Sequence, residues 1–320
     1  MSDWTINDIP SLAGKLAVVT GATGGLGFET SLALAAAGAE VVLTGRNDDK
    51  GSQAIDAICA QVPNALISYQ HLDLASLASV ANFARRFAQL HGPLDLLVNN
   101  AGVMALPTRQ TTADGFEMQF GTNYLGHYAL TAHLLPALRR GSAPRVVQLS
   151  STVHRVGVVD FDDLQGERSY RPWKAYSQSK LAMLMFALEL QRRSDVAGWG
   201  LISNAAHPGS SRTDLISNGP GNGGLIGLIS RLLRPLGHSA AAGALPTLFA
   251  ATAPAAVGGG YYGPSGIFEL SGPPAAARIV RGQDAAAAAR LWDVSAVLTG
   301  ASFDQAAVRV MAAHGSAEFR

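Results

Sequence analysis

The sequence predicts an α/β fold in which helices cover both faces of a doubly wound parallel sheet, within a single domain. Short apolar runs rich in valine and leucine alternate with longer helical segments as far as residue 206, and that rhythm is typical of parallel sheets. A glycine-rich turn at 21–27 follows the first apolar run and opens the first helix. Polar residues follow most of the later runs. Because ligands bind beyond the carboxyl ends of such strands, these residues predict one site at that edge.

The first strand–helix–strand unit occupies the N-terminal part of this pattern. The run 15–20, with adjacent valines, predicts a strand buried on both faces, and 26–37 predicts a helix that stops at Gly38. Residues 40–45 supply the second strand. The glycine turn between the first strand and the helix suits an anion, since a helix N-terminus has unpaired N–H groups and glycines let phosphates approach the backbone. Because its spacing differs from G-x-G-x-x-G, an ordinary glycine turn is the alternative.

The later elements follow from periodicity and length. One surface helix has a clear signal, because Leu77, Val80, Phe83 and Phe87 lie three or four residues apart. Further strands are expected at 65–70, 94–98, 145–149 and 201–206. Helices are expected at 48–61, 77–90, 112–140 (with a break near 121–126), 173–193, 241–253 and 284–298.

Composition and charge narrow the class of protein. A content of 48% hydrophobic and 15% charged residues is that of a globular chain, and a formal net charge of +1 gives no electrostatic case for binding nucleic acid. No apolar run approaches the ~20 residues that span a bilayer, and the N-terminus lacks the apolar core of a secretory signal. The single cysteine, Cys59, excludes an internal disulfide. We therefore expect a soluble, cytoplasmic protein.

We expect one domain over residues 1–320, with two additions to the sheet. The segment at about 210–238 is expected to fold over the substrate as a mobile lid, and 255–320 forms a C-terminal extension. Glycines, leucines and isoleucines in the lid indicate a roomy, apolar pocket. Arg231 and Arg234 offer little positive charge for a membrane surface, so membrane contact is not expected.

Tyr176 and Lys180 are the most informative pair of polar residues. At positions i and i+4 of the predicted helix 173–193 they share a face. A phenol has a pKa near ~10, but a neighbouring ammonium favours the phenolate and lowers that value. The pair therefore predicts an acid/base group that works near neutral pH. The alternative is structural, because Tyr-x-x-x-Lys is a common helical pattern.

Two other kinds of chemistry are not supported. The histidines show neither the H-E-x-x-H spacing of a metal site nor a cluster with cysteine, so no metal is expected. Ser151 lacks the G-x-S-x-G context of a serine hydrolase nucleophile. His207 has no acidic partner at catalytic spacing, and we interpret it as a packed residue at a strand end.

Four motifs occur in the order seen in short-chain dehydrogenases/reductases: Thr20-Gly-x-x-x-Gly-x-Gly27, Asn99-Asn-Ala-Gly102, Ser151 and Tyr176-x-x-x-Lys180. The chain resembles this family over roughly residues 12–300. The segments 120–127, 150–154 and 163–167, and the tail with Tyr-Tyr-Gly-Pro and Arg-Leu-Trp, are most similar to its retinol-dehydrogenase-like branch. The resemblance implies a Rossmann fold and hydride transfer between a nicotinamide cofactor and a carbonyl or alcohol.

The resemblance also implies roles for individual residues. Tyr176 would exchange a proton with the substrate oxygen, and Ser151 would hold that oxygen by a hydrogen bond. Lys180 would lower the pKa of Tyr176 and bind the nicotinamide ribose. Asn123 would position a water between Lys180 and solvent, or alternatively would serve at a helix kink beside Gly126. The pocket wall is expected from Met104, Leu106, Val153, His154 and Trp173.

The expected cofactor is NADP(H) rather than NAD(H). NAD enzymes commonly place a carboxylate at the end of the second strand, whereas this chain has Arg46, whose guanidinium suits a 2′-phosphate. Asp73 is expected at the adenine, or alternatively caps the helix that starts at Ser76. Asn100 is expected at the ribose, and the Asn99–Asn100 pair would also tie neighbouring strands together. The expected cofactor-binding residues are Gly21, Thr23, Gly25, Leu26, Gly27, Arg46, Asp73, Leu74, Asn100, Ala101, Tyr176, Lys180, Pro208, Gly209 and Thr213.

Two other functions stay open at this point: a nucleotide-binding sensor without catalysis, and a reductase of C=C bonds on the same fold. The complete set of Asn123, Ser151, Tyr176 and Lys180 argues against the sensor. The expected partner is a small apolar carbonyl or alcohol. The resemblance implies a homodimer or homotetramer through helices near 112–140 and 173–193, whereas a C-terminal extension covering that surface would leave a monomer.

Overall fold

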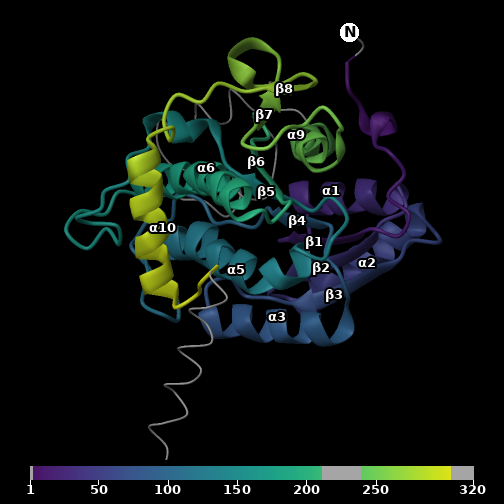
Figure 1. Ribbon diagram of the computed structural model, residues 1–320, viewed down its shortest axis with the longest axis horizontal. Coiled ribbons are helices and arrows are strands. Elements are labelled where there is room, and N and C mark those ends of the chain that lie inside the picture. The colour runs from purple at the N-terminus through teal and green to yellow at the C-terminus, as the bar shows by residue number, and fades with distance from the viewer. Residues whose placement is uncertain (1–2, 211–238, 304–320) are drawn as a thin grey trace, which may run out of the picture.

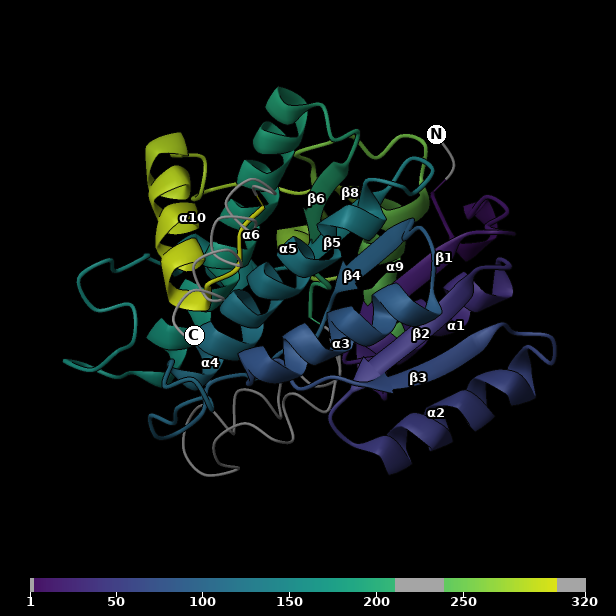
Figure 2. The same ribbon diagram turned by 60° about the horizontal axis from the view of Figure 1, so that its bottom comes forward.

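The computed structural model describes residues 3–210 and 239–303 of the 320-residue chain. It contains an eight-stranded sheet in the order β3-β2-β1-β4-β5-β6-β7-β8 (Figures 1 and 2). Neighbouring strands run parallel as far as β7, and β8 pairs with β7 in the antiparallel sense. The predicted doubly wound parallel sheet is therefore confirmed. The strands are β1 Leu16–Thr20, β2 Glu40–Gly45, β3 Ile67–His71, β4 Leu96–Asn99, β5 Arg145–Leu149, β6 Ile202–Ala206, β7 Tyr261–Pro264 and β8 Pro274–Ala276.

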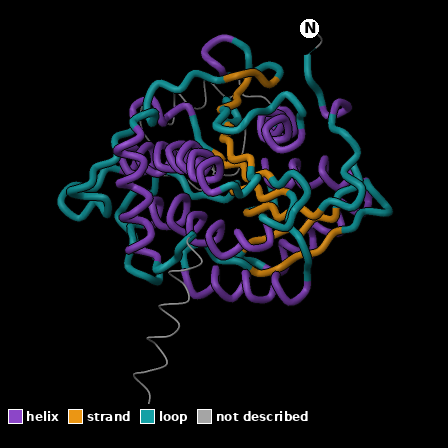
Figure 3. Tube along the Cα trace, in the orientation of Figure 1, coloured by secondary structure: helices purple, strands orange, loops and turns teal. Residues whose placement is uncertain are grey.

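Helices cover both faces of the sheet (Figure 3). One face packs against α3, α5 and α6, with α10 outside them, and the other packs against α1, α2 and α9. The α-helices are α1 Gly25–Ala36, α2 Asp48–Gln61, α3 Leu77–Leu90, α4 Met118–Phe120, α5 Gly126–Leu138, α6 Pro172–Ala197, α9 Ala240–Thr252 and α10 Ala285–Thr299. Shorter turns are the 3₁₀ turns η1 Ile6–Asp8, η3 Thr152–Val156 and η5 Ile267–Glu269, and the π-helical turn η2 Gly121–Leu125.

Local sequence explains where several helices begin and end. The side chain of Asn47 accepts from Lys50 N at the start of α2, and Ser76 accepts from Ser79 N at the start of α3, as expected of N-cap residues. The helix α6 begins at Pro172, which needs no N–H partner there, and ends before Gly198 in the left-handed conformation.

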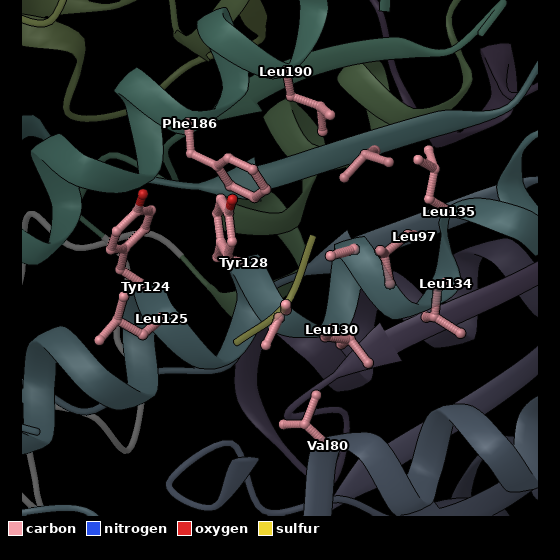
Figure 4. Close-up of a cluster of buried hydrophobic side chains, with 14 of the residues drawn as sticks. Val80, Leu97, Tyr124, Leu125, Tyr128, Leu130, Leu134, Leu135, Phe186 and Leu190 are labelled. Atoms are coloured by element: carbon pink, nitrogen blue, oxygen red, sulfur yellow. The ribbon is translucent and has the colours of Figure 1, made fainter. Parts of the chain in front are cut away.

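The larger of the two main cores lies between the sheet and α3, α5 and α6. Figure 4 shows Tyr128 of α5 facing Phe186 of α6, and their ring centroids are 5.4 Å apart. Trp292 of α10 packs edge-on against Tyr128, at 5.3 Å, from the outside. Figure 1 shows α10 crossing beside α6 and α5, so the extension covers the surface that the resemblance assigned to subunit contacts.

One expectation for the elements was wrong, and two strands were missed. The helix expected from residue 112 begins at Met118, because Thr111 and Glu117 instead form an isolated antiparallel bridge before it. The break expected near 121–126 is present as the π-helical turn η2. The strands β7 and β8 were not predicted, since each is short and contains proline, which masks any alternating pattern. Within the described residues, no helix is both long and apolar enough to cross a membrane.

Candidate active site

The strand order reverses between β1 and β4, and a cleft of about 560 Å³ lies at this carboxyl edge. Such a reversal is where ligands bind in open α/β sheets. The cleft runs from the glycine turn after β1 to the side chains of Tyr176 and Lys180 on α6. The expected residues that line it are Gly21, Thr23, Gly25, Leu26, Gly27, Arg46, Asp73, Leu74, Asn100, Ala101, Tyr176, Lys180 and Pro208.

The glycine turn is shaped for close approach of a ligand. Gly21 has φ +63°, and a Cβ there would lie 2.9 Å from Ala101 Cα. A Cβ at Gly27 would collide with the Gly21 carbonyl and the Asn100 side-chain amide. The N-cap of α1 is Gly24, which offers no side-chain oxygen to the first N–H groups. The donors at this helix N-terminus therefore remain for an anion such as a pyrophosphate, and the cradle fits a dinucleotide.

Arg46 and Lys50 form the cationic end of the cleft. Within residues 3–210 and 239–303, no carboxylate forms an ion pair with Arg46. The nearby Asp48 is engaged by His71 Nδ1 at 3.0 Å and by the Tyr69 hydroxyl at 3.1 Å. Lys50 was not predicted as a site residue; its signal in the sequence was its place in the first turn of the helix after β2, four residues beyond Arg46.

Asp73 lines the cleft and also shapes its own turn. Its Oδ1 accepts from Ala75 N at 2.9 Å, while Ser76 caps α3. The contact with adenine therefore stays a prediction. Asn100 lines the cleft too, and its Nδ2 donates to Thr20 O at 2.7 Å. Asn99 ties β4 to β5 by donating to Gln148 Oε1 at 3.0 Å, as expected of a structural member of the pair.

Tyr176 and Lys180 line the other end of the cleft, and Ser150 lines it as well, whereas Ser151 is not among the lining residues. The Ser151 side chain interacts with the Tyr176 phenol and acts to lower its pKa. Lys180 Nζ lies 5.9 Å from the centroid of the Tyr176 ring and donates to Leu149 O at 2.9 Å. The neighbouring Ser150 is occupied differently, since its hydroxyl donates to Lys180 O at 2.7 Å. The interaction with Tyr176 favours Ser151, whereas the cleft lining includes Ser150 and not Ser151, so the choice of Ser151 stays a prediction.

The expected acidification of Tyr176 by Lys180 is wrong for the chain without cofactor. Burial raises the pKa of Tyr176 to about 12, opposed by the hydrogen bond with Ser151. Burial also lowers the pKa of Lys180 to about 8. The ammonium is directed to the Leu149 carbonyl, and its charge does not offset the loss of water around the phenol. Tyr176 is therefore protonated at neutral pH.

Asn123 sits in the π-helical turn, fully buried. Its side chain holds the backbone of Val103, with Oδ1 accepting from the N–H at 2.7 Å, and Nδ2 donates to Ser179 Oγ at 2.9 Å. These bonds join the loop after β4 to α6. The kink alternative agrees with the π-helical turn, and the expected water between Lys180 and solvent stays a prediction.

His127 joins the π-helical turn to the glycine turn, which the sequence did not reveal. Its Nδ1 lies 2.7 Å from Asn123 O and must donate to it. Burial lowers the pKa of His127 to about 3, so the ring is neutral and Nε2 accepts from the Thr20 hydroxyl at 2.8 Å. The Thr20 oxygen in turn accepts from Asn100 N at 2.9 Å and Ala101 N at 3.0 Å.

The remaining expected residues divide into three groups. Met104 and Leu106 line the cleft, whereas Val153, His154 and Trp173 do not. Trp173 packs edge-on against Tyr176 with ring centroids 6.0 Å apart. Gly209 lies behind Pro208, outside the cleft lining, with φ +68°. Thr213 and almost all of the expected lid lie outside the described residues.

The interpretation that His207 lacks an acidic partner is wrong. Its Nε2 lies 3.0 Å from Glu269 Oε2, contributed by the turn after β7. The residue is fully buried, as expected of a packed strand-end histidine. No group of three potential metal ligands occurs in the part of the chain that the structure describes.

Comparisons with known proteins agree with the fold and the motifs. The model of the short chain dehydrogenase family matches residues 15–220. The chain belongs to this family of oxidoreductases, which bind NAD(P), and to its retinol-dehydrogenase-like branch.

Individual relatives align over most of the chain. It is 42% identical over 299 residues to polyprenol dehydrogenase of Mus musculus, covering 92% of this chain and 86% of the relative. It is 39% identical over 298 residues to retinol dehydrogenase 13 of Mus musculus, covering 91% of this chain and 85% of the relative. A crystal structure of an uncharacterised protein from Mycobacterium paratuberculosis matches with a TM-score of 0.78 and 39% identity, covering 95% of this chain and 100% of that protein's chain.

Proposed function

We propose that this protein is an NADP(H)-dependent oxidoreductase that interconverts an apolar carbonyl compound and its alcohol. One observation carries the proposal: Tyr176, which interacts with the Ser151 side chain, lies with Lys180 at the end of the same cleft whose other end is the glycine turn. A nicotinamide cofactor held along this cleft supplies the hydride.

The protein would supply the proton. Because the pKa of Tyr176 is about 12, the phenol holds a proton at Oη at neutral pH and can donate it to a carbonyl oxygen. Ser151, whose side chain interacts with the Tyr176 phenol, would stabilise charge that develops on the substrate oxygen. Lys180, with a pKa of about 8, is an ammonium below that pH and would stabilise the phenolate that forms when Tyr176 gives up its proton.

The cationic end of the cleft supports NADP(H) over NAD(H). Arg46 has no ion-pair partner among the described residues, and Lys50 lines the same end. Two cations without a competing carboxylate suit the 2′-phosphate. Gly21, Thr23, Gly25, Leu26 and Gly27 would hold the pyrophosphate, and Asn100 and Ala101 the ribose.

The substrate proposal is a hydrophobic alcohol or aldehyde. Met104 and Leu106 form apolar wall beside Tyr176 in the cleft. Relatives named polyprenol dehydrogenase and retinol dehydrogenase support isoprenoid alcohols as the first compounds to try. We propose a single domain that is a monomer, because α10 covers α5 and α6.

The test is a panel of aldehydes, ketones and isoprenoid enals incubated with NADPH or NADH, followed by product identification. The proposal expects NADPH consumption together with a new alcohol. NADPH binding without turnover of any compound would favour a sensor, and a product with a saturated C=C bond and an intact carbonyl would favour a C=C reductase; either result contradicts the proposal.

A further inference from the structure

The carboxylate of Glu269 joins two segments that are far apart in the sequence. Its Oε2 lies 2.5 Å from an Arg155 guanidinium nitrogen and 3.0 Å from His207 Nε2. Its Oε1 accepts from Arg278 N at 3.1 Å. The Glu269 side chain is only 15% exposed, so these contacts are partly shielded from water. Such a pairing is stronger than one between exposed charges.

Through its contact with Arg155, Glu269 is connected to Ser151. Arg155 belongs to the 3₁₀ turn η3, and Ser151 is the N-cap of that turn. The adjacent His154 donates from Nδ1 to Ser151 O at 2.8 Å, which fixes the backbone of Ser151 to the same turn. Holding Arg155 therefore holds the segment that presents the Ser151 hydroxyl to Tyr176.

Through its contact with His207, Glu269 is connected to the turn at Pro208 and Gly209. Gly209 N donates to His207 Nδ1 at 3.2 Å, so Nδ1 carries no proton and Nε2 carries the proton given to Glu269. Burial lowers the pKa of His207 to about 4, so the ring stays neutral at neutral pH. Glu269 thereby sets the tautomer of His207 that binds Gly209 N. Pro208, which lies between His207 and Gly209 in the sequence, lines the cleft.

The backbone around Glu269 is held in a demanding conformation. Phe268 has φ 55° and Glu269 has φ 60°, and neither residue is glycine. Such conformations persist only where the surrounding contacts fix them. A second bond ties the same segments, since Ser210 N donates to Leu270 O at 2.9 Å. Glu269 also lies beyond the residues 15–220 that the family model matches.

We propose that Glu269 is a positioning residue that holds the Ser151 segment and the Pro208–Gly209 turn in register about the reaction centre. This inference deepens the proposed function and rests on it. Glu269 is not among the residues that line the cleft, and its carboxylate binds Arg155 and His207, so it acts through these two residues.

The test compares Glu269→Ala and Glu269→Gln with a control, Glu189→Gln. Glu189 is also a buried carboxylate held by two arginines, Arg192 and Arg193, but it lies in the C-terminal half of α6. For Glu269→Ala we expect kcat to fall by about tenfold or more, since small misplacements of reacting groups are costly. The NADPH Kd should change by less than about threefold, because the phosphate contacts dominate binding. Glu269→Gln, which retains an oxygen acceptor for His207, should lose less than Glu269→Ala.

A spectroscopic readout keeps the proposal testable without turnover. In protein labelled with ¹⁵N-histidine, His207, assigned with His207→Asn, should show Nε2 protonated and Nδ1 unprotonated. Glu269→Ala should shift this pattern, and Glu189→Gln should leave it unchanged. If the wild type turns over no carbonyl compound, the proposed function fails, and the histidine pattern still decides whether Glu269 sets the tautomer.

Three results would overturn the inference. The first is an unchanged kcat in a folded Glu269→Ala protein. The second is an equal loss of kcat in Glu189→Gln, which would indicate general destabilisation. The third is a His207 tautomer that does not depend on Glu269.

Discussion

The Tyr176 phenol and the Lys180 ammonium are both buried, yet burial moves their proton affinities in opposite directions. The pKa of Tyr176 rises to about 12 and that of Lys180 falls to about 8, because burial disfavours the charged form of each group. The phenol thus keeps its proton over the whole neutral range, and the lysine changes its charge at a pH that an ordinary assay can reach. Carbonyl reduction is the direction that this protonation state favours.

We therefore expect kcat/KM for carbonyl reduction to be level below pH about 8 and to fall above it with the slope of one ionisation. The sign follows because a rise in pH removes the Lys180 proton while Tyr176 is still protonated. The measurement is a series of initial rates from pH 6.5 to 10 at saturating NADPH. A reductive rate that climbs through this range would contradict the roles given to Lys180 and Tyr176.

Tyr128 offers a contrast at the same scale, because its hydroxyl is buried without a hydrogen-bond partner among the described residues. Removing such a group relieves the cost of its desolvation. Tyr128→Phe should raise the free energy of unfolding by about 1 kcal/mol, measured by urea denaturation, and should leave turnover unchanged. A clear loss of stability would mean that the hydroxyl has a partner.

Among the elements, the turn after β2 is where we propose that the cofactor preference is set. Arg46 and Lys50 stand together where the chain passes from β2 into α2. The glycine turn after β1 would contact the pyrophosphate that NAD and NADP share, so it would not discriminate between them. In the proposed function, discrimination comes from the two cations.

Arg46→Ala should raise the KM for NADPH by about tenfold or more, the scale of one lost hydrogen bond to a charged group, and should change the KM for NADH little. The matched control is Arg139→Ala, since Arg139 is exposed at the end of α5, at the opposite edge of the sheet. Equal increases in the KM for NADPH and the KM for NADH would mean that the 2′-phosphate binds elsewhere.

For the whole molecule, the decisive feature is that α10 covers α5 and α6. Trp292 packs against Phe186 at 5.7 Å and Phe303 at 4.3 Å, and the guanidinium of Arg193 lies 4.5 Å from its ring. The extension thus adds to the core of its own chain over α5 and α6.

Trp292→Ala should lower the free energy of unfolding by about 3–5 kcal/mol, the usual cost of truncating a buried tryptophan. Light scattering coupled to gel filtration should show a monomer for the wild type. An unaffected stability in the variant, or a wild-type dimer, would contradict the covering role of α10.

The sequence predicted the parts of the site that depend on topology or helical spacing. Asn100, Ser151 and the glycine turn were placed together because carboxyl ends of parallel strands meet at one edge, and Tyr176 and Lys180 because they lie one helical turn apart. The bond between His207 and Glu269 was missed, because it spans 62 residues and joins two segments without periodicity. The direction of the Tyr176 pKa was missed because it depends on how deeply α6 is packed, which spacing does not measure.

The most direct test of the central claim compares Tyr176→Phe with Tyr128→Phe, using NADPH and a carbonyl compound that the wild type reduces. Both variants remove one buried phenolic oxygen from the same side of the sheet. If Tyr176 supplies the proton, Tyr176→Phe should lower kcat by about 10² or more, with NADPH still bound, and Tyr128→Phe should turn over normally. Near-normal turnover by Tyr176→Phe would contradict the account.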